Sequence, residues 1–354
     1  MPFKFSASNI ADALYDDGWF GKWCHFIVDG QYGSTGKGAL AAVIARAGRN
    51  SIEVYATNAG PNSGHTAVLG STKVVTTQIP VGAAVAHLLP GPAFDTYLTA
   101  GAIINPKMLQ QEVEKYGVCP VIHPCAAVIT SEHLEQEQSN GSARVAGTAK
   151  GVGAALADKV NREGNLWGRQ DTWFGSSGVV RLEGRCVLHE SAQGFSLGVN
   201  EPRFAPATTS RECTVQQAMS DARIPRSMVN KVAMTLRTFP IRVGNTQMGY
   251  SGDFYEDQKE TSWEELGLPE EYTTVTKRVR RVFTWSWLQF IDAIRVNEPN
   301  LLNVNFMDYL PIDERETFIK QMLICYRQTL PHRPDPIILC GFGPEIDQMG
   351  LWHE

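Results

Sequence analysis

Short apolar runs that end in glycine-rich or polar loops recur along the chain and predict buried strands. The first run covers residues 24–28 and precedes a glycine-rich loop and an apolar stretch, 39–45, that predicts a helix. A second run covers 52–56. Further strands are expected at 186–189, 301–305 and 336–340, and further helices at 107–116 and 314–326. This alternation predicts an α/β fold with a mainly parallel central sheet.

The organisation of the chain predicts one large unit. With 354 residues, 43% of them hydrophobic, it can bury a large core, and no repeat or Pro/Gly/Ser linker divides it. We therefore expect an N-terminal extension over residues 1–20 and a single large domain over 21–354. The acidic, polar segment 252–271 is expected to be a surface excursion.

The loop between the first strand and the first helix is the strongest chemical signal. Residues 28–38 read VDGQYGSTGKG, and such a turn presents free backbone N–H groups and a helix N-terminus to an anion. Lys37 makes phosphate the expected anion. The spacing from Gly30 to Gly36 is one residue too long for a Walker A loop, and Gly38 stands where its Ser or Thr would be. The loop alone leaves open an ordinary tight turn with a surface lysine.

A second glycine-rich loop follows the second strand. Residues 58–66 read NAGPNSGHT and place an amide, a histidine and a threonine beside two glycines. Loops at the ends of parallel strands carry function in α/β folds. His65 is therefore better placed to meet a ligand than to serve only as a structural residue.

These two loops resemble the signature loops of adenylosuccinate synthetase. Residues 33–38 resemble its Gly-Asp-Glu-Gly-Lys-Gly loop, and 62–66 resemble its Asn-Ala-Gly-His-Thr loop. Further matches follow in the order of that family, at 147–153 with 158–160, 190–194, 242–244, 278–281 and 343–344. Since the matches cover nearly the whole chain, the resemblance implies the fold of that family, a single α/β domain related to the P-loop NTPases.

The departures from the family pattern change the expected substrates. Ser34 stands where the family has an aspartate that acts as the base toward N1 of inosine monophosphate (IMP) and as a Mg²⁺ ligand. A serine hydroxyl is a poor base and a weak metal ligand. The family reads the guanine of GTP with a Lys-x-Asp pair, which is replaced here by Asn303 and Asn305. Asparagine both donates and accepts, which suits adenine, so we expect ATP or dATP as the phosphoryl donor.

The smaller Ser34 side chain leaves room beside N1 and C2 of the purine, where guanine carries a 2-amino group. In this respect the chain resembles the viral branch of the family, which joins dGMP to L-aspartate to form 2-aminoadenylosuccinate for phage DNA. An ordinary synthetase acting on IMP and a non-catalytic nucleotide-binding protein are the alternatives. The sequence does not identify the group that takes the N1 proton. Asp29 is a candidate, but a role in capping the turn is favoured, and the charged groups of the substrates are a further candidate.

The resemblance implies a role for each matching residue. The catalytic residues would be Ser34, Lys37, His65 and Gln193. The donor nucleotide would meet Gly33, Thr35, Gly36, Lys37, Gly38, Gly64, His65, Thr66, Arg280, Asn303, Asn305, Gly343 and Pro344. The acceptor dGMP would meet Ser34, Asn62, Thr148, Lys150, Arg162, Gln193, Thr209 and Val243, with Arg162 reaching into the partner subunit of a homodimer. L-Aspartate would meet Thr273, Thr274, Thr276 and Arg278, and Mg²⁺ would meet Ser34 and Gly64.

Charge and cysteine content limit the possible partners and the cellular location of the protein. The net charge of −5 and a pI near 5.9 argue against a nucleic-acid partner, so the basic run 277–281 is better explained as a clamp for carboxylates and phosphates. The seven cysteines form no CxxC pair, which indicates reduced thiols in a cytoplasm. Since the chain shows no long apolar run and no signal-peptide pattern near its start, we expect no membrane partner and a cytoplasmic location, in the host if the protein is viral.

Overall fold

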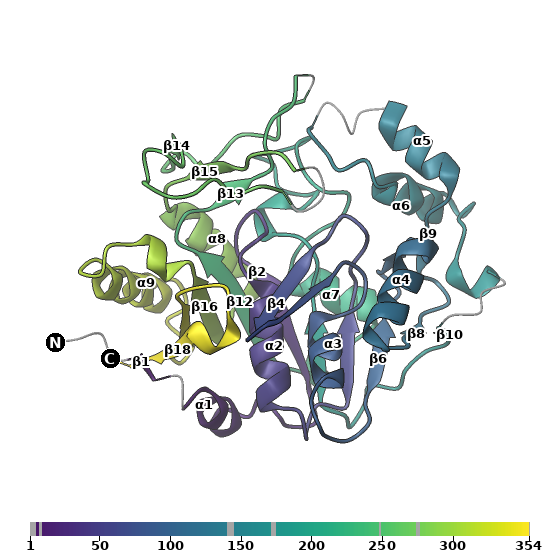
Figure 1. Ribbon diagram of the computed structural model, residues 1–354, viewed down its shortest axis with the longest axis horizontal. Helices are drawn as coiled ribbons and strands as arrows, with labels where there is room; N and C mark the ends of the chain where they lie inside the picture. Colours follow the sequence, from purple (N-terminus) through teal and green to yellow (C-terminus); the bar gives the residue numbers. More distant parts are fainter. Residues whose placement is uncertain are drawn as a thin grey trace.

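The computed structural model describes residues 5–6, 9–139, 145–170, 175–247, 249–273 and 277–353. Within these ranges the strands form one large sheet in the order β1-β18-β17-β16-β12-β2-β11-β3-β6-β8-β10 (Figure 1). Every neighbouring pair from β17 to β10 is parallel, and only β18 and β1 at one edge run antiparallel to their neighbours. The predicted α/β class with a mainly parallel sheet is confirmed.

The strands of the large sheet are short and separated by helices. They are β1 (Phe5–Ser6), β2 (Cys24–Asp29), β3 (Val54–Thr57), β6 (Asp95–Leu98), β8 (Val121–Ile122), β10 (Ser176–Ser177), β11 (Val187–Glu190), β12 (Val229–Arg237), β16 (Leu301–Asn305), β17 (Ile337–Gly341) and β18 (Met349–Trp352). The helices are α1 (Ile10–Asp16), α2 (Lys37–Ala47), α3 (Val81–His87), α4 (Pro106–Tyr116), α5 (Ser131–Ser139), α6 (Val152–Asn161), α7 (Val215–Ala222), α8 (Trp287–Asn297) and α9 (Arg315–Thr329).

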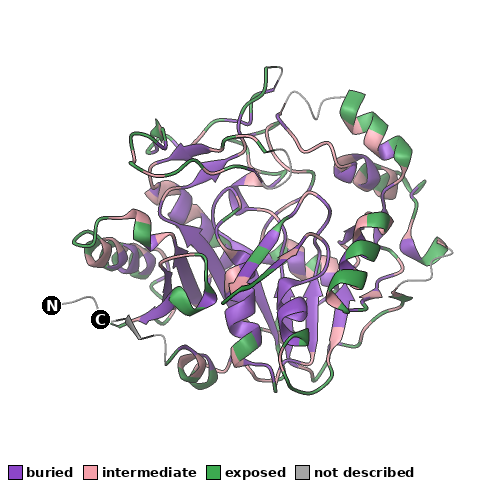
Figure 2. Ribbon diagram, in the orientation of Figure 1, coloured by how far each residue is buried: buried purple, intermediate pink, exposed green. Residues whose placement is uncertain are grey.

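Both faces of the central part of the large sheet are buried, whereas Ser176 and Ser177 of the edge strand β10 are exposed (Figure 2). In β2, Phe26 and Val28 belong to one hydrophobic core and Ile27 belongs to the other, because successive side chains of a strand point to opposite faces. Helices α1 to α4 contribute to the core of Ile27, and α7 to α9 contribute to the core of Phe26. A strand covered on both faces reads as a continuous apolar run, which explains why these strands could be recognised in the sequence.

Smaller sheets extend from the carboxyl ends of the parallel strands. One pairs β13 (Ile241–Arg242), β15 (Arg281–Phe283) and β14 (Glu260–Thr261), one is the hairpin of β4 (His65–Leu69) and β5 (Thr72–Thr76), and one pairs β7 (Ile103–Ile104) with β9 (Ala127–Val128). In Figure 1 the sheet of β13 to β15 lies above the ends of β2, β12 and β16. These additions surround the edge of the sheet at which ligands bind in α/β folds.

Residues at the start of the chain are part of the packed structure. Ile10, Leu14 and Trp19 are buried in the core beside α2, and β1 pairs with β18. The segment 252–271, expected to be a surface excursion, includes β14 and the buried side chains of Tyr255 and Trp263. None of the helices in the described ranges combines the length and apolar character needed to span a bilayer.

Candidate functional site

The loop after β2 has the conformation that a phosphate-binding turn requires. Gly33 and Gly36 have φ values of 92° and 93°, in the left-handed region that favours glycine, and α2 begins directly after Gly36. The buried Asp29 stabilises the loop, since its Oδ1 accepts hydrogen bonds from the backbone N–H groups of Gln31 and Gly33 at 2.8 and 3.2 Å. This is the capping geometry that the sequence favoured for Asp29.

Lys37 is held at the base of this loop. Its Nζ lies 3.0 Å from Oδ2 of Asp29 and donates to the carbonyl of Gln193 at 2.8 Å, and both charged side chains are buried. The ammonium therefore joins the phosphate loop to the segment after β11. Gly194 reinforces this junction, because a Cβ there would lie only 2.1 Å from the backbone nitrogen of Gly33.

Gly38 brings the second glycine-rich loop against the first. A Cβ at Gly38 would lie 2.7 Å from the backbone nitrogen and oxygen of Thr66, so only glycine allows α2 and β4 to approach this closely. The approach places His65 beside the phosphate loop, with Asn62 and Gly64 next to it. Two motifs that are distant in the sequence thus form one wall of a single cavity.

His65 is fixed by a buried carboxylate. Its Nδ1 lies 2.5 Å from Oε1 of Glu190, the last residue of β11, and the other oxygen of Glu190 accepts from the backbone N–H of Gly82 at 3.3 Å. Because a carboxylate only accepts, Nδ1 of His65 carries the proton, and Nε2 is the imidazole nitrogen left for a ligand. No role was predicted for Glu190 from the sequence, although it begins one of the segments that resemble the family.

A cavity of about 1140 Å³ collects most of the predicted residues at the carboxyl edge of the sheet. The predicted residues that line it are Gly33, Ser34, Thr35, Gly36, Lys37, Gly38, Asn62, Gly64, His65, Thr66, Thr148, Gln193, Thr209, Val243, Thr273, Arg280, Asn305, Gly343 and Pro344. They come from loops spread over the whole chain. The cavity is large enough for more than one nucleotide-sized ligand to share its walls.

Some predicted residues do not line this cavity. Arg278 turns its guanidinium to the carbonyls of Gly244 and Ala146, at 3.1 and 3.2 Å. Lys150 is half-buried in the loop before α6, and Arg162 is exposed at the end of that helix. Thr274 and Thr276 lie outside the described residues.

Asn303 is also away from the cavity. It is completely buried in β16, and its Nδ2 lies 3.4 Å from the carbonyl of Leu339. Asn305 lines the cavity, but its Nδ2 already donates to the carbonyl of Thr35 at 2.6 Å and to Oδ1 of Asn303 at 2.8 Å. Asn303 therefore orients Asn305, and only the Oδ1 of Asn305 remains to accept from a base.

Ser34 is hydrogen-bonded to an arginine side chain. Its backbone φ is 54°, and its Oγ accepts a hydrogen bond from Nη1 of Arg280 at 2.9 Å. Burial lowers the pKa of Arg280 to about 10, with the nearby Glu271 opposing that effect. The guanidinium is therefore still charged at neutral pH. Gln193, opposite, donates from Nε2 to the hydroxyl of Ser63 at 3.1 Å.

Glu137 is a cavity residue that the sequence did not reveal. Its carboxylate accepts from the backbone N–H groups of Gly151 and Gly153 at the start of α6, at 2.7 and 2.5 Å. The N-terminus of α6 is thus already capped, so a phosphate on this wall would meet side-chain hydroxyls, among them those of Thr148 and Thr209. No pattern at Glu137 itself distinguishes this cap from an ordinary surface glutamate.

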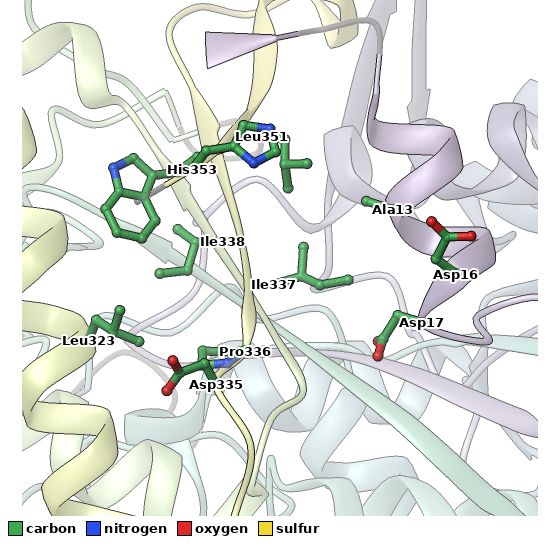
Figure 3. Close-up of a pocket in the computed structure, with 11 residues that line it drawn as sticks. Ala13, Asp16, Asp17, Leu323, Asp335, Pro336, Ile337, Ile338, Leu351 and His353 are labelled. Atoms are coloured by element: carbon green, nitrogen blue, oxygen red, sulfur yellow. The ribbon is translucent and has the colours of Figure 1, made fainter. Parts of the chain in front are cut away.

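A second hollow, of about 490 Å³, lies where β17 begins, at the amino end of that strand (Figure 3). It is lined by Ile337 and Ile338 of β17 and by the side chains of Asp17 and Asp335. Both carboxylates are paired, Asp17 with Lys231 at 2.7 Å and Asp335 with Arg327 at 2.6 Å. None of the residues predicted for the site lies there.

The described residues contain no group of three or more His, Cys, Asp or Glu side chains that could hold a metal by themselves. All seven cysteines are free, in agreement with the expected thiols. His123, next to Cys125, is buried, and its Nδ1 accepts from the backbone N–H of Cys125 at 3.0 Å, which is a structural contact.

The parallel sheet, the glycine-rich loop and the cavity at its edge define a nucleotide-binding α/β enzyme of the phosphate-loop class. More narrowly, the chain belongs to the adenylosuccinate synthetase family, whose model matches residues 26–169 and 179–325. The family resemblance seen in the sequence is thereby confirmed.

Relatives in this family include phage enzymes and cellular ones. N6-succino-2-amino-2'-deoxyadenylate synthase of Salmonella phage PMBT28 is 33% identical, covering 92% of this chain and 96% of the relative. The adenylosuccinate synthetase of Archaeoglobus fulgidus is 28% identical, over 91% of this chain and 96% of the relative. The solved succinoaminodeoxyadenylate synthetase of cyanophage S-2L, bound to dGMP and to dATP as an energy donor, is 30% identical with a TM-score of 0.82, covering 94% of this chain and 96% of that one.

Proposed function

We propose that the protein is a ligase that joins the amino group of L-aspartate to C6 of dGMP, using ATP or dATP, and so forms 2-aminoadenylosuccinate. The observation that carries the proposal is Ser34 at the tip of the phosphate loop, where the family otherwise has an aspartate. The phage relatives with this activity in their names, and the cyanophage structure with dGMP and dATP, support it. Such an enzyme would act in the cytoplasm of an infected host.

The first step would transfer the γ-phosphoryl group of the donor to O6 of dGMP. The O6–phosphorus bond forms, the bond to the β-phosphate oxygen breaks, ADP or dADP leaves, and the N1 proton is lost. Such transfers depend mainly on positioning and charge neutralisation. Lys37 and the backbone N–H groups of the loop are suited to the donor phosphates. Nε2 of His65 is suited to the charge that develops near O6 when it also carries a proton, because only an N–H can donate to a negative oxygen.

The second step would displace the new phosphate. The aspartate nitrogen attacks C6, the C6–O bond breaks, and inorganic phosphate leaves with the oxygen that was O6. Thr273 lines the cavity and would contact the aspartate. For Arg278 to meet a substrate carboxylate, it would exchange its present bonds to two backbone carbonyls for bonds to the ligand.

The acceptor nucleotide would lie against the opposite wall. Thr148 and Thr209, which line the cavity, are suited to its 5′-phosphate, Val243 would contact the nucleotide, and Gln193 would hold its purine. Arg162 is exposed at the end of α6, where it could serve the site of a partner subunit in a homodimer.

Mg²⁺ is the expected metal of this family, and neutral oxygens are available for it. The hydroxyl of Ser34 and the carbonyl of Gly64 both belong to cavity residues, and Mg²⁺ is usually held by few protein oxygens together with phosphates and water. When bound, the ion would neutralise charge on the phosphates of the donor. For Ser34 to contribute, its hydroxyl would have to share or lose the hydrogen bond from Arg280.

An oxygen label tests this chemistry directly. dGMP carrying ¹⁸O at position 6 is incubated with the enzyme, Mg²⁺, L-aspartate and ATP, and the released phosphate is analysed by mass spectrometry. The proposal predicts one ¹⁸O in each phosphate formed and a nucleotide product without the label. A control without L-aspartate should release no labelled phosphate. Phosphate that forms without the label would contradict the proposal.

A further inference from the structure

Arg237, the last residue of β12, carries a completely buried guanidinium next to the cavity. Its charge is balanced by Glu271, with Nη2 at 2.5 Å from Oε1 and Nη1 at 3.1 Å from Oε2. Burial by itself would raise the pKa of Glu271, but the charges of Arg237 and Arg280 and the hydrogen bonds from Arg237 and Tyr309 together hold that pKa below its ordinary value. The pair is therefore ionised, and removing either member would leave a buried charge without its partner.

This one side chain touches three loops of the cavity wall. Nη1 of Arg237 lies 3.4 Å from the carbonyl oxygen of Ser34, in the phosphate loop. The guanidinium carbon lies 3.9 Å from the ring centroid of Phe306, in the loop that follows β16 and Asn305. Glu271 belongs to the segment that leads into the loop expected for aspartate. Ser34, Phe306 and Glu271 all line the cavity, whereas Arg237 stands behind them.

Ser34 depends on these contacts for its conformation. It is not a glycine, yet its φ of 54° lies in the left-handed region, and such a residue persists only when its surroundings hold it. Arg237 holds its carbonyl, and Arg280 holds its hydroxyl at 2.9 Å. The backbone of Arg280 is in turn bonded to the carbonyl of Glu271 at 2.8 Å. A shift of Phe306 or of Glu271 would therefore displace the groups that bind the carbonyl and the hydroxyl of Ser34.

We infer that Arg237 is a positioning residue that couples binding of the donor nucleotide to binding of the acceptor nucleotide. The donor base would pack by Asn305 and Phe306, and Arg237 would transmit that packing to Ser34, beside the acceptor purine. The inference rests on the proposed function and adds to it a named link between the two nucleotide sites. Coupling of this kind is reciprocal, so each nucleotide raises the affinity for the other by the same factor.

Titration calorimetry on the full-length protein measures this factor. The Kd of dGMP is determined with Mg²⁺, first alone and then with a saturating β,γ-imido analogue of ATP, which binds without being cleaved. The wild-type protein is expected to bind dGMP at least about fivefold more tightly with the analogue. In Arg237→Lys this factor should fall toward one, because a single ammonium cannot span Glu271 and the carbonyl of Ser34. Glu271→Gln keeps the shape of the side chain and removes its charge. In this variant the factor should also fall toward one.

A second arginine–glutamate pair, in the small sheet of β13 to β15, serves as a control that distinguishes coupling from stability. Arg281 also donates to a carboxylate through two nitrogens, with Nε at 2.7 Å from Oε1 and Nη2 at 2.6 Å from Oε2 of Glu260, and neither residue lines the cavity. Arg281→Lys should lower the melting temperature and leave the coupling factor unchanged. An unchanged factor in Arg237→Lys and Glu271→Gln, or an equal loss in Arg281→Lys, overturns the inference. Wild-type protein that binds both nucleotides without coupling overturns it too but leaves the proposed function standing, whereas failure to bind either nucleotide contradicts both.

Discussion

Nδ1 of His65 lies 2.5 Å from Oε1 of Glu190, and both side chains are buried between the two glycine-rich loops. This pairing fixes the orientation of the imidazole and leaves Nε2 for the reacting groups. A carboxylate behind a histidine also stabilises the imidazole when it takes on positive charge. Glu190 therefore acts through His65.

Glu190→Gln is expected to lower kcat by about 100-fold, since the amide cannot balance charge on His65 and so weakens its help to the transferring phosphoryl group. The KM values should change little, because Glu190 itself touches no substrate. Steady-state phosphate release measures both. Glu112→Gln is the control, as Glu112 is another buried carboxylate, bonded to the backbone of Gln78 and Ile79 outside the cavity. Equal losses of kcat in the two variants would contradict this role for Glu190.

Ser34→Asp tests whether space at this position selects the purine. The larger side chain would occupy the place expected for the 2-amino group, and its carboxylate would pair with Arg280, which now contacts Ser34 at 2.9 Å. We expect kcat/KM for dGMP to fall about 10- to 100-fold. Ser34→Asn has the same size without the charge and should lose dGMP turnover as well. Full activity of either variant with dGMP would refute the argument from space.

Asn305 is expected to govern the choice of donor base through its contacts in the structure. In Asn305→Asp, a carboxylate would face the carbonyl of Thr35 without a proton to donate, so kcat/KM for ATP should fall. The double variant Asn303→Lys/Asn305→Asp restores the Lys-x-Asp pattern and should gain activity with GTP relative to ATP. Asn300→Asp, in the turn before β16, serves as the control and should leave the ratio unchanged. A GTP/ATP ratio that stays at the wild-type value in the double variant would rule out this role.

Two buried histidines predict a loss of stability in mild acid. Burial lowers the pKa of His25 and of His189 to about 4, so both are neutral in the folded protein at neutral pH. The unfolded chain takes up these protons near pH 6.5, and the free energy of unfolding must then fall as the pH drops from about 6.5 to 4, by up to about 3 kcal/mol for each histidine. Denaturant unfolding at several pH values measures this slope.

His189→Gln removes one of these titrating groups and should make the slope shallower over the same range. Replacement of the exposed His87 by Gln provides the comparison and should leave the slope unchanged. An identical pH slope in the wild type and His189→Gln would show that the buried imidazole does not govern acid stability.

The elements of the fold could be predicted where both faces of a strand are covered. The runs 24–28 and 301–305 correspond closely to β2 and β16, because a strand buried on both sides must be apolar nearly throughout. The helix expected at 39–45 begins earlier, at Lys37, since the left-handed Gly36 already ends the loop. Local pattern was therefore sufficient for these elements and for the position of the phosphate loop, but β12, in the middle of the sheet, was not predicted.

The side-chain pairs that hold the site residues in position could not be predicted in this way. Arg237 pairs with Glu271, and His65 pairs with Glu190, across long stretches of sequence. A single carboxylate or guanidinium in the sequence carries no sign of such a partner, because the sheet order decides which loops meet. Asn303 illustrates the same limit, since its place two residues earlier in β16 buries it behind Asn305, whose side chain it contacts and which reaches the cavity.

The most direct test compares dGMP with IMP as the acceptor. Purified protein is given Mg²⁺, L-aspartate and ATP with either nucleotide, phosphate release is followed, and products are identified by mass; dATP and GTP are then tried as donors. The account predicts turnover with dGMP, formation of 2-aminoadenylosuccinate and little activity with IMP. Turnover with IMP and none with dGMP would mean an ordinary adenylosuccinate synthetase that tolerates Ser34, and no turnover with any donor would mean a nucleotide-binding protein without this activity.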